Sequence, residues 1–294
     1  LALGFTGCMV QSNSIGSTFS TAFGVPSWIV GIILVAVCGF IFVGGVQRLA
    51  SVTEKLVPIM AAVFLLGGVV VLIARIQYVP ATFGMIFKYA FQPQAIVGGA
   101  FGTALKAAIS QGAKRGLFSN EAGSGSAPCA AAAASCDDPV KMGFVQALGV
   151  LIDTVVICSC TAFLMLLVPQ EITEGLAGMD LLQTALQYHL GGFGVVFIAA
   201  TLALFSFSTF LGVLYYARGN VAYLCGDNWW SQTVYKLIAL AMLVIGGMQA
   251  YTVVWDLGDV GIGLMTIFNM IALVPMAKEA LAALNDYEKR KKLQ

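Results

Sequence analysis

Residues 108–136, AISQGAKRGLFSNEAGSGSAPCAAAAASC, lie between long apolar runs and hold the side chains best suited to chemistry. Four glycines occur here with an amide, a carboxylate and a proline: Gly112, Gly116, Gly123, Gly125, Asn120, Glu121 and Pro128. This combination interrupts a helix and leaves backbone carbonyls and amides free. At membrane depth, such backbone persists only where protein buries it or a watery cavity faces it. The stretch therefore predicts a broken helix beside a binding cavity.

A short half-helix is predicted after this break. Ser126 suits an N-cap and Pro128 the first turn, and residues 129–135 are alanine-rich with high helix propensity. The amides at the start of such a half-helix favour a carboxylate, as discontinuous helices of secondary transporters do. An ordinary hydrophilic loop between two short helices is the alternative. A phosphate-binding loop fits less well, because no strand is predicted before Gly123 and no GK[ST] follows it.

A second carboxylate, Asp153, stands in the middle of the apolar run LGVLIDTVVICSCTAF. A carboxylate in mid-membrane costs free energy and is a functional candidate by default. Asp153 is alternatively a structural partner for a cation such as Lys114 or Arg115. The sequence leaves both possibilities open.

Hydroxyl and amide side chains in two other uncharged segments offer further ligands. Ser206, Ser208 and Thr209 in LFSFSTFLG can present oxygens to a hard cation such as sodium, although such hydroxyls more often bond to their own helix. Gln11 and Asn13 can donate and accept hydrogen bonds inside a helix bundle. Residues of this kind join helices more often than they hold a substrate.

These side chains need a membrane-spanning helical framework to position them. The sequence is 59% hydrophobic and only 10% charged, whereas soluble domains carry about 25% charged residues. The runs do not alternate as barrel strands would, so they predict helices. We predict an all-α integral membrane protein with about eight segments, at residues 1–22, 27–47, 55–77, 95–135, 140–168, 190–224, 230–250 and 254–280, the fourth being discontinuous.

The placement of lysine and arginine predicts the orientation of these segments. Positive residues mark cytoplasmic connections, and here they recur at alternate ends of the segments, with Arg75 and Lys88 as exceptions. Cytoplasmic positions are predicted for Arg48, Lys55, Lys141, Arg218, Lys236 and the basic tail at residues 289–294. The C-terminus is thus expected in the cytoplasm of a multi-pass cell-membrane protein. On the opposite side, Met179 to Leu190 has the spacing of an interfacial amphipathic helix, with His189 in a surface position.

Composition and motifs also exclude several functional classes. A net charge of +1 gives no basic field for nucleic acid. The sequence has no HExxH or GxSxG motif, so no enzyme activity, cofactor or metal other than sodium is expected. A channel would need repeated polar rings, which are not seen. Because Leu1 lies inside an apolar segment, residues 1–294 are interpreted as a single transmembrane domain of a longer protein.

Three stretches together resemble the alanine/glycine:cation symporter family. They are GAKRGLFSNEAGSGSAP with its alanine run, DDPVKMGFVQALGVLIDT and FSFSTFLG, which occur in that family's order and spacing along the whole chain. The resemblance implies a partial LeuT-type inverted-repeat fold comprising core helices 3 to 10. Its first core helix, which supplies half of both sites, would lie outside this sequence, so residues 1–294 alone are not expected to transport.

The same resemblance implies particular roles for residues. Substrate, a small neutral amino acid such as alanine or glycine, would contact Gln11, Phe118, Ser119, Asn120 and Gly123. The sodium site would be completed by Ser208 and Thr209, and Val213 stands where a larger side chain is expected. The implied mechanism is sodium-coupled alternating access. Proton coupling through Asp153 or Glu121 is the variant, and the oligomeric state is not predicted.

Overall fold

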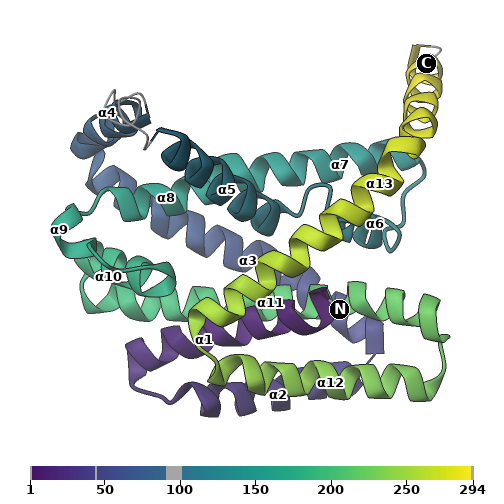
Figure 1. The fold of residues 1–294 in the computed structure, drawn as a ribbon, viewed down its shortest axis with the longest axis horizontal. Coiled ribbons are helices and arrows are strands. Elements are labelled where there is room, and N and C mark those ends of the chain that lie inside the picture. The colour runs from purple at the N-terminus through teal and green to yellow at the C-terminus, as the bar shows by residue number, and fades with distance from the viewer. Residues whose placement is uncertain (1, 44, 91–100, 293–294) are drawn as a thin grey trace.

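The computed structural model describes residues 2–43, 45–90 and 101–292, and all regular structure in these ranges is helical. This confirms the predicted all-α class. The helices form two tiers, which are crossed obliquely by the last helix of the chain (Figure 1).

One tier, here called the inner layer, consists of four helices packed around the first of them. They are α1 (Cys8–Phe23), α2 (Ser27–Val43), α11 (Gly192–Cys225) and α12 (Trp229–Met248), with the π-helix η1 (Ala2–Gly7) leading into α1. Leu211 and Leu214 of α11 are fully buried in its core. Small residues allow the helices to approach closely: a Cβ on Gly246 would lie 2.6 Å from the Met9 carbonyl oxygen. Asn13 also joins α1 to α12, as polar residues in membrane bundles do.

The other tier contains the broken helix and its neighbours. The outer arm is α5 (Phe101–Asn120), α6 (Ser126–Ala131), α7 (Pro139–Leu151), the π-helix η4 (Ile152–Cys158) and α13 (Tyr251–Lys292). The helices α3 (Gly45–Ala74) and α8 (Ser159–Leu166) pack together and connect this arm to the inner layer through α11. In Figure 1 α13 starts beside α1, passes α5 and reaches α7, and its end projects beyond the rest of the molecule.

The remaining helices are short and connect the long ones. They are η2 (Ile76–Tyr78), α4 (Val79–Ala90), α9 (Gln170–Thr173) and α10 (Gly178–Leu190). The amphipathic helix predicted at residues 179–190 is confirmed as α10, with Leu182 and Leu186 buried. The surface position predicted for His189 holds only in part. Its ring is half-buried and Nε2 donates to the Leu164 carbonyl oxygen at 2.9 Å, because α10 packs against α8.

Five of the described helices are long and apolar enough to cross a membrane. They are Ser51–Ala74, Pro139–Leu166, Gly192–Cys225, Trp229–Met248 and Tyr251–Lys292. They agree with the predicted integral membrane protein, and the count of eight segments stays a prediction. The start of the predicted segment at 95–135 lies partly outside the described residues. α13 continues past residue 280, so the basic tail is helical through Lys292.

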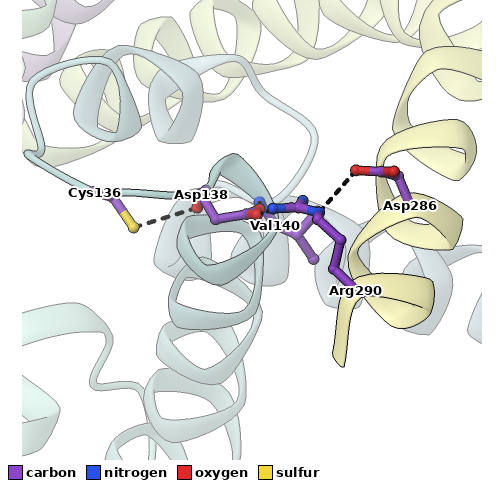
Figure 2. Close-up of polar contacts among 5 residues, drawn as sticks. All are labelled: Cys136, Asp138, Val140, Asp286 and Arg290. Atoms are coloured by element: carbon purple, nitrogen blue, oxygen red, sulfur yellow. Dashed lines mark hydrogen bonds and ion pairs between the residues drawn. The ribbon is translucent and has the colours of Figure 1, made fainter. Parts of the chain in front are cut away.

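A polar clamp ties the projecting end of α13 to the start of α7 (Figure 2). The carboxylate of Asp138 accepts from the Val140 amide at 2.9 Å, which caps α7. It also accepts from the Arg290 guanidinium at 2.6 Å, and Arg290 in turn pairs with Asp286 at 2.9 Å. The Val140 amide and Arg290 hold the pKa of Asp138 below its usual range. The clamp is thus built on a charged carboxylate.

Candidate functional site

The break predicted from the sequence begins where α5 ends, at Asn120. The helix runs through Gly112 and Gly116, so the prediction that these two glycines help to interrupt it is wrong. The interruption lies at residues 121–125, where Gly123 (φ 81°) and Gly125 (φ 97°) take left-handed conformations. Asn269 of α13 donates to the Gly123 carbonyl oxygen at 2.8 Å. The freed backbone of the break is therefore held by the outer arm itself.

The half-helix after the break is shorter than predicted. α6 spans only Ser126–Ala131, and its N-cap is Gly125 rather than Ser126. Beyond it, amides bond to carbonyls three residues earlier, as from Ala133 to Ala130 and from Ala134 to Ala131. These tighter bonds end the helix within the alanine run, despite its high helix propensity. The predicted continuation to Ser135 is wrong.

A cavity of about 260 Å³ lies where the break faces the inner layer. It is lined by η1 and α1, by the end of α5, and by parts of α11 and α13. Of the residues predicted to bind substrate, Gln11, Phe118 and Ser119 line it, while Asn120 and Gly123 do not. Thr209 and Glu121 also face it. Residues far apart in sequence thus meet at one small cavity.

An aromatic wall closes one side of this cavity. The rings of Phe118 and Trp255 lie 4.9 Å apart between centroids, and Tyr251 stacks beyond Trp255 at 5.5 Å. Gly258 makes room for the wall, because a Cβ there would lie 3.1 Å from the Phe118 ring. The buried Nε1 of Trp255 has no hydrogen-bond partner within the described structure. The wall thus contains an N–H donor that is buried without a partner, on a residue that lines the cavity.

Two cations and one buried carboxylate lie next to this wall. The Arg115 guanidinium contacts the carboxylate of Asp259 at 2.6 Å, and the Lys114 ammonium lies 3.4 Å from the same group. Arg115 also lies 5.0 Å from the centroid of the Trp255 ring, a cation–π distance. Lys114 and Arg115 are therefore paired with Asp259, and the proposed alternative of a pair with Asp153 is wrong.

Asp153 instead anchors the end of α5 from the neighbouring π-helix. Its carboxylate accepts from the Ser119 hydroxyl at 2.6 Å, with the Cys158 thiol 4.0 Å away. Asn120 next to it donates to the Thr154 hydroxyl at 2.9 Å. Single-turn π-helices within longer helices are frequent at functional sites. Here the π-helix fixes the side chain of Ser119, which lines the cavity.

A second cavity, of about 600 Å³, lies on the other side of the break. Ser208 and Thr209 line it, which places both predicted cation ligands at its wall. The Ser208 hydroxyl donates to the Phe205 carbonyl oxygen at 2.9 Å, so it is engaged in the back-bonding that the sequence offered as an alternative. Ser206 faces the smaller cavity instead.

Sequence reasoning missed two contributors to the site. Trp255 stands at the end of an apolar run, and nothing in the sequence around Asp259 marks it as a partner of Arg115. Both become recognisable through long-range contacts, namely the Phe118 ring and the Arg115 guanidinium. Neither contact leaves a pattern in the local sequence.

The whole chain is similar to one family of transporters. The sequence profile described as "Sodium:alanine symporter family" matches residues 1–294. A putative sodium/proton-dependent alanine carrier protein of Bacillus subtilis is 40% identical over 307 residues, covering 99% of this chain and 63% of the relative. A probable sodium/glutamine symporter of the same organism is 41% identical over 292 residues, covering 99% and 60%. The chain therefore spans less than two thirds of these relatives.

Proposed function

We propose that this chain, which belongs to the sodium:alanine symporter family, is the larger part of a carrier that moves a small neutral amino acid together with sodium. Membership confirms the resemblance predicted from the sequence, and with it a multi-pass membrane transporter and not an enzyme. The observation that carries the proposal is the cavity of about 260 Å³, which joins Gln11, Phe118 and Ser119 at the helix break.

The size and lining of this cavity favour a small amino acid. Pockets for drug-sized ligands span roughly 300–1,000 Å³, so a cavity of about 260 Å³ suits a smaller molecule. We infer that the free Nε1–H of Trp255 and the Gln11 amide donate to the substrate carboxylate, while Phe118 covers its side chain. Asn120 and Gly123 would support substrate binding by holding the break, since they lie outside the lining.

Sodium is proposed to bind at the wall shared by the two cavities. Thr209 faces both cavities, and its hydroxyl is a suitable ligand for a hard cation. Ser208 would turn its hydroxyl from Phe205 to complete the site. Two relatives, from Bacillus subtilis and Bacillus sp. strain PS3, are named as sodium/proton-dependent alanine carriers. A proton therefore remains the second candidate for the coupling ion.

The overall arrangement of the intact protein is part of the same proposal. We propose a LeuT-type fold in the cell membrane, with core helices 3 to 10 supplied by this chain and the basic end of α13 in the cytoplasm. The two cavities on either side of the break would then be the two access routes of an alternating-access carrier. The substrate would be released from the same site to either face of the membrane.

Uptake by the intact parent protein in proteoliposomes tests this proposal. Labelled alanine, glycine and glutamine are supplied under an inward sodium gradient and under a matched potassium gradient. We expect uptake only with sodium, and we expect Thr209→Ala to lose the sodium dependence while remaining folded. Thr173→Ala on the short helix α9 is the matched control, because it makes the same change outside both cavities. Equal uptake under both gradients would refute sodium coupling.

A further inference from the structure

Glu121 lies at the boundary between the two cavities. Its side chain lines the cavity of about 260 Å³ and also that of about 600 Å³. Thr209 and Val213 are the other residues that line both cavities. Of these three, only Glu121 has a side chain that can bind or release a proton near physiological pH when its surroundings are altered. It is the titratable group common to both spaces.

The backbone holds this carboxyl group at the boundary. Glu121 has φ 51°, the one positive value among the described residues that are not glycine. This left-handed conformation is unfavourable for a residue with a side chain, and it persists only where the surroundings determine it. The Glu121 amide donates to the Leu117 carbonyl oxygen at 3.2 Å. The Ser124 hydroxyl donates to the Glu121 carbonyl oxygen at 2.6 Å.

No cation compensates this carboxyl group within the described structure. The nearest positive residues along the chain, Lys114 and Arg115, are paired with Asp259. The phenol of Tyr216 on α11 lies near both the Glu121 carboxyl group and the thiol of Cys129 on α6. The residues that line the two cavities from η1, α1, α3 and α13 are all uncharged. The Ser126 hydroxyl hydrogen-bonds to the Glu121 side chain, but it is neutral and leaves the charge uncompensated. A carboxylate without a countercharge at membrane depth is costly, and a proton removes that cost.

We propose that Glu121 is a proton-binding site that exchanges with either cavity, so that a proton crosses with the substrate. The carboxylate takes the proton from water in one cavity and becomes a neutral carboxylic acid. It returns the proton to water in the other cavity after the arm has moved, and no other group is consumed. This inference rests on the proposed transport function and adds a second coupling ion to it.

Asp153, the other carboxylate of the predicted coupling pair, does not share this placement. It lines neither cavity among those described, and its carboxylate is engaged by the Ser119 hydroxyl. Its contact explains how Ser119 is positioned, whereas Glu121 has direct access to both spaces. The two carboxylates therefore have different roles.

The experiment measures proton movement and alanine movement separately in proteoliposomes that hold the intact parent protein. Sodium-driven alanine uptake is followed with label, and lumen pH with a trapped dye. Exchange of labelled for unlabelled alanine at equal sodium and pH on both sides reports substrate binding and translocation alone. We compare wild type with Glu121→Gln and Glu121→Asp. Glu171→Gln on the exposed helix α9 is the matched control.

We expect sodium-driven uptake by the wild type to acidify the lumen. In Glu121→Gln the acidification should fall to the level of protein-free vesicles while alanine exchange continues. Glu121→Asp should retain acidification with a displaced pH dependence, and Glu171→Gln should match the wild type. Uptake without acidification in the wild type, or acidification retained in Glu121→Gln, overturns the proton site and leaves symport intact. If Glu121→Gln fails to fold, Glu121→Asp with an undisplaced pH dependence likewise overturns it. Absence of sodium-driven uptake overturns the transport function and the inference with it.

Discussion

The inner layer and the outer arm are held together by different kinds of contact. In the inner layer, helices meet at their backbones through small residues, and apolar side chains such as Leu211 are fully buried. In the outer arm, several helix contacts are polar, as in Arg115 with Asp259 and Ser119 with Asp153, although the start of α13 packs closely on η1 and α1. Apolar residues of α13 such as Phe268 are 70% exposed. The first region is closely packed, and the second is tied at a few points.

This difference indicates which part of the molecule can move. Closely packed helices resist displacement, because an interior of that density leaves little room into which side chains can move. A few hydrogen bonds and ion pairs can break and form again at small net cost. The two cavities lie between the two regions, with α11 on one side and the broken helix on the other. Both cavities thus border the part of the molecule that is held by fewer contacts.

The largest expected effect tests the close packing of the inner layer. Gly246→Ala places a methyl group against the backbone of Met9 and the hydroxyl of Ser12. The Met9 backbone lies within α1 and cannot move away from the new methyl group. We expect a loss of about 3 kcal/mol in the free energy of unfolding, typical of overpacking. Thermal or denaturant unfolding in detergent measures it. Gly219→Ala on α11, which meets open space, is the control and should not destabilise. Equal stability of the two variants would contradict the comparison.

The next effect concerns substrate choice at the wall that the inner layer presents to both cavities. Val213→Ala enlarges both cavities on the side formed by α11 of the inner layer. Because removing methyl groups from a pocket changes discrimination by one to two orders of magnitude, we expect glutamine uptake relative to alanine to rise roughly tenfold. Competition between the two labelled amino acids measures this ratio. Val196→Ala, on an exposed part of the same helix, should leave the ratio unchanged. A constant ratio in both variants would remove Val213 from the pocket.

A smaller effect tests the polar clamp of the outer arm. The pKa of Asp138 is lowered in the folded protein, so the clamp is fully present above the ordinary carboxyl value of about 4 and is lost as pH falls through the lower folded pKa. We expect the amides of residues 280–292 to lose protection from hydrogen exchange in that acidic range. Asp138→Asn keeps the cap but not the charge, so it should lose protection already at neutral pH. Protection independent of pH would show that the ion pair does not hold α13.

The smallest expected effect concerns the contact of α10 with α8. Burial lowers the pKa of His189, outweighing its bond to the Leu164 carbonyl oxygen. The neutral ring is thus favoured in the folded state, and its contribution is present above about pH 6.5 and is lost as pH falls through the lower folded pKa. We expect about a few tenths of a kcal/mol, because water screens this half-exposed group. His189→Gln should flatten the dependence of unfolding on pH between 7.5 and 5.5. An unchanged slope would contradict the assignment.

Local patterns in the sequence predicted much of the framework. Uncharged runs of suitable length predicted the long helices, and α10 was recognised from the spacing of its apolar residues. The interruption after Asn120 was predicted because the glycines there lack the restriction of a side chain. Gln11, Phe118 and Ser119 were placed at one cavity by the family resemblance and not by their local pattern.

Contacts between distant segments account for what the sequence did not predict. The helix α4 and the π-helices η1 and η4 follow from no local signal that was recognised. The pairing of Arg115 with Asp259 spans 144 residues, and a single sequence contains no trace of it. His189 became half-buried through the packing of α10 on α8, which the surface character of the isolated helix could not reveal.

The length of α13 and its polar attachments near both ends have a mechanical consequence. It is tied to α5 through Asp259 and to α7 through Arg290. Thirty-one residues of helix separate these anchors, or about 47 Å, which exceeds the roughly 30 Å hydrocarbon core. Pro275 lies between them and removes one helical hydrogen bond, which weakens the helix at that point. α13 is therefore a rod long enough to span a bilayer, and it links α5 near one end to α7 near the other.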